Sequence, residues 1–476
     1  MAIHHVGAGV VLLGALAALL PNASPPRGEA ADPPAPAAVT IYDPRPDHPW
    51  NRLHRALFVR TTRDGKELGH DALDPLLWPE TGHLLVGRSH EDAVRVLDEF
   101  LKPDVIDAVR DPLKRAVLQH DLWAVFEWVA DPFVSRFGRH GSRPGREHEY
   151  PGPKHPAARQ ELRGRLAQAV AKLALTPKAV GGLPDNYAAA VRAKAFPTRF
   201  DPEHPDRPFL PDDLFDPAGP WVCVGGSPDG PPLALAHARF FSGRSAFLVF
   251  LRLPDGRRAT LDYLDALGKV RSPLETREGK RADGTIQEVV NLRSDLPQFP
   301  AGTQVALVRR MILVTDDEKL WASPVTESVQ LRVYRRIPPG DGDNFKAAKE
   351  SQAFFEFELR RADLFAGTSG GLRPAPPDET VYLALQFLTG YGDPFETPPD
   401  HGRPGHPMPL RDTCASCHPG PGIYGVNSYS RRCSTPGGTR TDLTFRPSTP
   451  GDELDRAVAW KREQYLWGLF RGLTAR

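Results

Sequence analysis

Net charge, long apolar runs and cysteine are all scarce in this chain, and each shortage excludes a class of protein. The 476 residues carry 60 Lys and Arg against 59 Asp and Glu, a formal net charge of +1. This balance gives no electrostatic reason to expect a nucleic acid or an acidic membrane as partner. The one long apolar run, residues 6–20, is about 15 residues and short for a bilayer span. We therefore expect no membrane span in the mature chain.

The first 31 residues have the layout of a secretory signal peptide. An apolar run follows residues 1–5, and small residues lead to Ala30 and Ala31, where cleavage is expected. No cysteine lies near that position, which argues against a lipoprotein anchor. An uncleaved membrane anchor is the alternative. Residues 32–49 are rich in Ala and Pro and are predicted to be a linker.

Two of the four cysteines lie in one short motif, Cys414-Ala415-Ser416-Cys417-His418. The C-x-x-C-H spacing lets two thiols reach the two vinyl groups of one porphyrin, while the next residue brings an imidazole to the iron. So few cysteines would rarely form this motif by chance. The stretch resembles the haem-attachment motif of c-type cytochromes, although the resemblance covers only five residues.

The resemblance implies haem c held by Cys414 and Cys417, with His418 as the proximal ligand, and one-electron transfer to a redox partner protein. Bacteria attach such haem outside the inner membrane, so the resemblance and the signal peptide imply the same localisation, periplasmic or secreted. A basic loop at 136–165 could dock an acidic redox partner, or be a solvated surface.

Other interpretations of the cysteines remain open. Cys414 and Cys417 could form a disulfide or a thioredoxin-like redox pair, although the following Pro419–Gly422 cannot continue a regular helix. A zinc site would use both cysteines with His418 and Cys433, but a second closely spaced ligand pair is missing. Cys223 and Cys433 could form a disulfide with each other.

The chain departs from class I cytochromes c in its second axial ligand. These proteins usually take it from a methionine downstream of the motif, and here neither Met nor His follows His418. Met408 and His406 are the nearest candidates, and His155 or His237 from another domain are more distant ones. An open iron position is a further possibility. Arg431 and Arg432 could contact haem propionates, or form a solvated turn.

The periodicity predicts an α+β multidomain protein. Residues 50–205 are predicted to be helical, because apolar residues recur at helical spacing along 118–129 and 162–173. Residues 220–392 are predicted to form a β-rich antiparallel domain with one buried and one wet face, from apolar runs at 245–253 and 305–314 and alternation at 329–334 and 355–359.

Residues 393–476 are predicted to be the haem-attachment segment with a terminal helix. Thr449 is suited to be its N-cap, Pro450 its first residue, and Asp452 the acid of a capping box. An apolar stripe from Leu454 to Leu473 could pack near a haem edge or on the β-rich domain.

The sequence raises three further function classes. Gly367–Gly371 matches the G-x-S-x-G elbow of hydrolases, but prolines follow where a helix is needed, so a glycine-rich loop is predicted. The missing downstream ligand would also suit a haem enzyme or gas sensor with an open iron site. A non-haem extracytoplasmic binding or structural protein is the remaining alternative.

Overall fold

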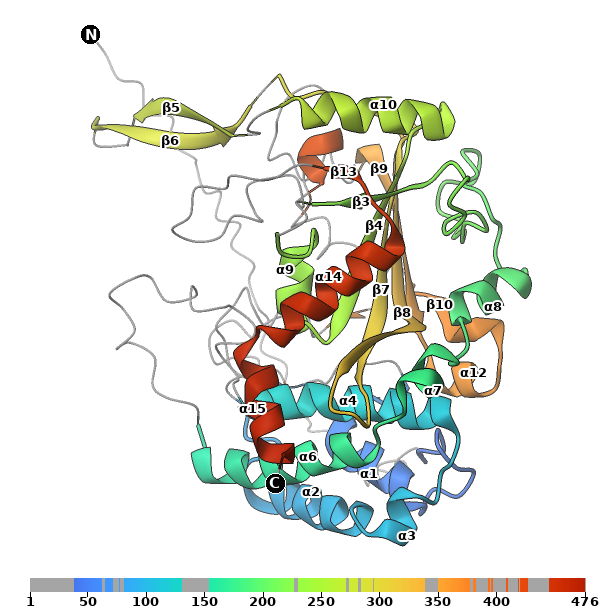
Figure 1. Ribbon diagram of the computed structural model, residues 1–476, viewed down its shortest axis with the longest axis vertical. Helices are drawn as coiled ribbons and strands as arrows, with labels where there is room; N and C mark the ends of the chain where they lie inside the picture. The colour runs from blue at the N-terminus through green and yellow to red at the C-terminus, as the bar shows by residue number, and fades with distance from the viewer. Residues whose placement is uncertain are drawn as a thin grey trace, which may run out of the picture. The chain divides into compact units, whose positions relative to one another are not determined.

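The computed structural model describes residues 38–61, 65–71, 77, 81–130, 154–226, 230–270, 274–280, 284–293, 295–338, 350–376, 380–381, 393, 395–396, 408–409, 418, 420–426 and 445–475. The predicted signal peptide and most of the basic loop at 136–165 lie outside these residues. The described part is α+β, as predicted, with helices packed around an antiparallel sheet (Figure 1).

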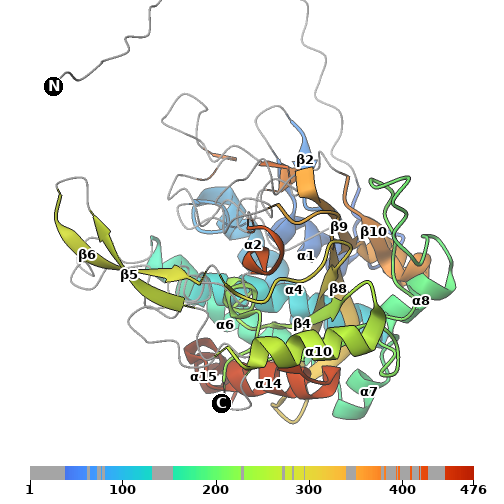
Figure 2. The same ribbon diagram turned by 90° about the horizontal axis from the view of Figure 1, so that it is seen from above.

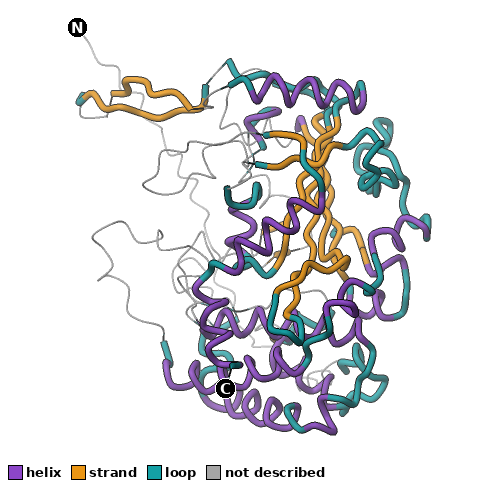
Figure 3. The backbone as a smooth tube through the Cα atoms, in the orientation of Figure 1, coloured by secondary structure: helices purple, strands orange, loops and turns teal. Residues whose placement is uncertain are grey.

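The sheet has seven strands in the order β10-β9-β8-β7-β4-β3-β13, and every neighbouring pair is antiparallel. Its members, drawn as orange strands in Figure 3, are β3 (Val222–Gly225), β4 (Ser245–Arg252), β7 (Gln304–Val314), β8 (Leu320–Tyr334), β9 (Gln352–Leu359), β10 (Leu372–Pro374) and β13 (Arg446–Pro447). The predicted apolar strands are therefore confirmed. One edge strand, β13, comes from the last segment of the chain, so that segment completes the sheet.

The remaining elements are shorter strand pairs and helices. The pairs are β1 (Arg60–Thr61) with β2 (Glu67–Leu68), β5 (Leu274–Lys280) with β6 (Ile286–Leu292), and β11 (Thr380–Val381) with β12 (Met408–Pro409). The helices are α1 (Pro49–Phe58), α2 (Gly87–Phe100), α3 (Pro103–Ile106), α4 (Pro112–Ala130), α6 (Pro156–Lys172), α7 (Pro177–Gly181), α8 (Asn186–Arg192), α9 (Leu235–Phe240), α10 (Gly256–Gly268), α12 (Arg361–Phe365), α14 (Pro450–Arg462) and α15 (Tyr465–Thr474).

Both faces of the sheet are covered, which corrects the prediction of one wet face. Val329, Leu331 and Val333 face a core shared with α8. On the opposite face, called here the α9 face, α9, α10 and residues 420–426 pack against the sheet. Because of this cover, Arg332 and Glu356 are buried although they occupy the polar positions of the alternation.

Helices α1, α2, α4, α6 and α15 form one core at the end of the sheet away from α10 (Figure 1). The predicted apolar residues of α4 and α6 are all buried, and so are Trp123 and Trp128. However, α4 is buried on every side from Ala116 to Val129, not on one face. The ends of β4, β7 and β8 join this core through Ala246, Ile312 and Leu320, so α4 lies between helices and sheet.

The predicted terminal helix is two helices, α14 and α15, which follow one another at the C-terminus (Figure 2). The Thr449 hydroxyl accepts from the Asp452 backbone N–H at 3.1 Å, which confirms the N-cap. The helix is interrupted at Glu463 and Gln464. Tyr465 is therefore exposed instead of continuing the predicted apolar stripe. Helix α14 packs on β4, whereas α15 packs on α6.

Three further predictions concern the G-x-S-x-G segment, the pairing of Cys223 and the presence of membrane-spanning helices. The G-x-S-x-G segment is a 3₁₀ turn that leads into β10, in agreement with the predicted loop. Cys223 is buried and free, and burial raises the pKa of its thiol to about 12; Cys433 lies outside the described residues. Among the helices that are described, none is long and apolar enough to cross a membrane.

One buried histidine of the helical core gives the fold a pH dependence. His54 of α1 is fully buried, with Nε2 3.0 Å from the carbonyl of Gly69. Burial lowers the pKa of its imidazole to about 4. The unfolded chain takes up this proton near pH 6.5, whereas the folded chain does not. Stability therefore falls as the pH drops from about 6.5 toward 4.

Between pH 7 and pH 5, His54 is expected to remove about 2 kcal/mol of stability. In His54→Gln, the amide can still donate to Gly69 but takes up no proton, so acidification should cost about 2 kcal/mol less than in the wild type. Urea unfolding at the two pH values measures the difference. His204→Gln, at a largely exposed histidine, is the control and should behave as the wild type. An equal loss in the wild type and His54→Gln would contradict the assignment.

Candidate functional site

Of the C-x-x-C-H motif, the structure describes His418. Cys414, Cys417, Cys433, His406, Arg431 and Arg432 lie outside the described residues. Met408 is in β12, where its backbone pairs with Val381. His155 is exposed at the start of α6, and nothing in the described structure brings it to His418. His237, the other distant candidate, lies next to His418.

The loop that follows the motif is compact, and its glycines make it so. Residues 422–425 form a 3₁₀ turn. A Cβ at Gly420 would overlap the backbone of Tyr424, and a Cβ at Gly425 would overlap the carbonyl of Gly420. Gly422 has φ +57, a conformation that glycine adopts without strain. The Pro-Gly-Pro-Gly sequence therefore specifies a tight turn.

Two residues between β6 and β7, Arg293 and Gln298, anchor this loop. The Gln298 side-chain oxygen accepts from the Ile423 N–H at 2.8 Å, and its amide donates to the Pro421 carbonyl at 3.2 Å. The Tyr424 hydroxyl donates to the Arg293 carbonyl at 2.8 Å. Ile423, Tyr424 and Val426 are also buried in the core of the α9 face. The loop is thus fixed to the sheet domain by both polar and apolar contacts.

The anchored loop orients His418. Its Nδ1 lies 2.7 Å from the carbonyl oxygen of Gly425, seven residues on. A carbonyl can only accept, so Nδ1 carries a proton, and in the neutral imidazole Nε2 then carries the lone pair. Metal-binding histidines typically donate the N–H of their other ring nitrogen to a carbonyl or carboxylate, which fixes both the orientation of the ring and its tautomer. The His418 ring is therefore held in a form suited to binding a metal through Nε2.

The ring of His237 on α9 lies close to that of His418. Their centroids are 6.3 Å apart, with an interplanar angle of 27°. Burial, and then the positive charges of Arg332 and Arg309, lower the pKa of His237 to about 4. The imidazole is therefore neutral at pH 7, the form that binds metals.

The sheet beneath α9 supplies buried charge. Arg309 of β7 pairs with Glu327 at 2.7 Å and lies 3.7 Å from the ring centroid of Phe241. Burial and the nearby Glu358 raise the pKa of Glu356 well above its usual value, while Arg309 and Arg332 act against this rise. The α9 face thus combines two imidazoles with cations and a carboxyl group that holds its proton more readily than usual.

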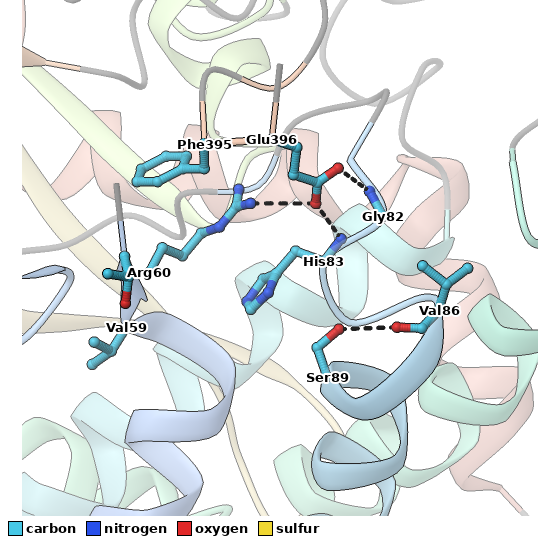
Figure 4. A pocket seen from close by; sticks show the side chains of 9 residues that line it. Val59, Arg60, Gly82, His83, Val86, Ser89, Phe395 and Glu396 are labelled. Carbon is cyan, nitrogen blue, oxygen red and sulfur yellow. Dashed lines mark hydrogen bonds and ion pairs between the residues drawn. The ribbon is translucent and has the colours of Figure 1, made fainter. Parts of the chain in front are cut away.

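A second candidate site is a pocket of about 410 Å³ near the start of α2, lined by residues that include Arg60, His83, Ser89 and Glu396 (Figure 4). Its charges are largely satisfied within the protein. Arg60 pairs with Asp393 at 2.7 Å, and the Glu396 carboxylate accepts from the backbone N–H groups of Gly82 and His83 at 2.8 and 2.7 Å. Burial and Arg60 lower the pKa of His83 to about 3. The contacts tie Asp393 and Glu396 to β1 and to the loop before α2, and they leave one neutral imidazole.

Sequence patterns only partly identify these residues. The sequence does not predict that Gln298 and Gly425 support the motif, and it identifies Pro419–Gly422 only as a break in a regular helix. The spacing of glycines after His418 was the available signal, whereas no sequence pattern links Gln298 to a loop more than a hundred residues away.

No protein-family model, no curated protein and no solved structure matches this chain. Its function is therefore inferred from its own residues.

Proposed function

We propose that this chain is an exported protein that carries one covalently bound haem c and transfers single electrons to a redox partner protein. The observation that carries the proposal is the bond from His418 Nδ1 to the carbonyl of Gly425, at 2.7 Å. His418 is the last residue of a C-x-x-C-H motif. The bond leaves the lone pair on Nε2, as proximal ligation requires.

The residues present fit this cofactor. Cys414 and Cys417 would hold it through thioethers, and His418 would ligate the iron. A haem bound there supplies one-electron redox chemistry. The contribution of the chain is to fix the His418 ring through Gly425, and to fix Gly425 through the Gln298 anchor. The predicted signal peptide at 1–31 supports export, the condition for attaching haem c.

Replacing both motif cysteines, in Cys414→Ser/Cys417→Ser, is expected to abolish covalent haem. A hydroxyl cannot replace the thiolate that attacks the vinyl carbon. Proteins expressed with the haem-attachment machinery and exported are compared by haem staining on a denaturing gel and by the pyridine haemochrome spectrum. His418→Ala should keep some covalent haem, because the thioether sulfurs remain. The spin state of the iron should change, because the proximal imidazole is lost.

Cys223→Ala is the matched control, because Cys223 is a free, buried cysteine on the sheet. It should retain the haem signal. A wild-type protein that is exported in full but shows no c-type spectrum would refute the proposal. An unchanged covalent signal in the double Ser variant would refute the assignment of the two cysteines.

A further inference from the structure

We propose that His237 is the second axial ligand of the haem iron, so that the site is bis-histidine. This inference rests on the proposed function. From the sequence, Met408 and His406 are the nearest candidates and His237 is one of the more distant ones.

The separation of the two rings is the first argument. Two imidazoles that bind one metal from opposite sides, through metal–nitrogen bonds of about 2.0–2.1 Å, have ring centroids about 6–6.5 Å apart. The observed separation of His237 and His418 is 6.3 Å. Parallel rings in face contact would overlap at about 3.5–4.0 Å between atoms. The pair is wider than full face contact; its separation lies within the range of about 4.5–7 Å for offset aromatic rings, and it also matches the separation that a shared metal requires.

The chemistry of His237 is the second argument. Its ring lies 5.4 Å from that of Phe247, and no hydrogen bond to it occurs within the described part of the chain. The side chain is half-buried and neither ring nitrogen is fully enclosed, so a ring nitrogen is accessible to a metal. Ligation to a metal would satisfy that nitrogen.

The support of His237 is the third argument. Helix α9 is fixed against the sheet by the buried side chain of Ala238, together with that of Ala234 just before the helix. The chain turns sharply after the helix at Gly243, which has φ +72 and whose N–H donates to the Ala238 carbonyl at 2.7 Å. A Cβ at Gly243 would collide with Trp460 of α14. Both histidines are thus held by packed elements, one by α9 and one by the anchored loop, as a preorganised ligand pair requires.

The test is the ferric spectrum of the full-length protein with its haem attached, by optical absorption and electron paramagnetic resonance. The wild type is expected to be low-spin without the red-edge band of methionine ligation. His237→Ala should keep its covalent haem but become high-spin, and added imidazole should restore the low-spin spectrum. His204→Ala, at an exposed histidine, is the control and should match the wild type.

His237→Met covers the case in which His237→Ala does not fold. It should remain low-spin, gain the methionine band and show a higher reduction potential. A low-spin spectrum that persists unchanged in His237→Ala or His237→Met would overturn the proposal. So would a wild-type methionine band that is lost in Met408→Ala, or a low-spin signal that is lost in His406→Ala. These outcomes leave the haem assignment intact, whereas absence of covalent haem in the wild type would overturn both.

Discussion

Lys461→Met is expected to lower the free energy of unfolding by about 3–5 kcal/mol, because it leaves a buried carboxylate without its counter-charge. Lys461 of α14 and Glu127 of α4 are 0% and 2% exposed and form an ion pair. The ammonium also donates to the Ser242 carbonyl at 2.6 Å and lies 4.9 Å from the ring centroid of Trp123. Chemical denaturation measures the loss.

The apolar double variant Glu127→Leu/Lys461→Met should recover most of this loss. Burial raises the pKa of Glu127 and lowers that of Lys461, in each case against the opposing effect of the partner. Burying the two charges therefore costs more than their attraction returns, and removing both can be nearly neutral. Arg258→Met, in an exposed pair with Asp262, is the control and should change stability little. A small loss in Lys461→Met alone would contradict the expectation.

Asp121→Asn is expected to cause a loss of similar size, about 3–5 kcal/mol, because it leaves a guanidinium buried without a counter-charge. Both oxygens of Asp121 on α4 accept from Arg361 at the start of α12, at 2.7 and 2.5 Å. Both side chains are 4% exposed. The pair joins the helical core to the end of β9, so its loss should loosen the junction between helices and sheet.

This second pair should tolerate apolar replacement less well than the first. Burial by itself lowers the pKa of Arg361, but the charge and hydrogen bonds of Asp121 outweigh burial and raise it. Each apolar double variant leaves one carbonyl without a donor, that of Ser242 in the first pair and that of Asp71 in the second, so the contrast rests on the opposite effect of the partner charge. Arg361→Lys should also destabilise, because an ammonium lacks the fork that meets both oxygens. Full recovery of stability in the apolar double variant would contradict this contrast.

These buried charges show which features of α4 the sequence patterns could predict and which they could not. Periodicity located α4, and the apolar residues at 118, 122 and 129 are in its core. The same pattern could not show that Asp121 and Glu127 are buried as well. Their counter-charges lie in α12 and α14, 240 and 334 residues away. A polar residue on a helix is normally exposed, and only long-range pairing makes its burial tolerable.

The same division applies to the candidate site. The C-x-x-C-H motif needs only local spacing, because two thiols and an imidazole would have to meet one porphyrin, and so the sequence by itself was enough to predict His418 as the proximal residue. The strands were equally local, since alternation and apolar runs predicted β4, β7, β8 and β9. Only the tertiary structure decided that Gln298 anchors the loop below His418 and that α9 brings His237 within 6.3 Å of it. Contacts across such separations arise from packing on a shared sheet face, and packing of distant segments leaves no periodic signal in the chain.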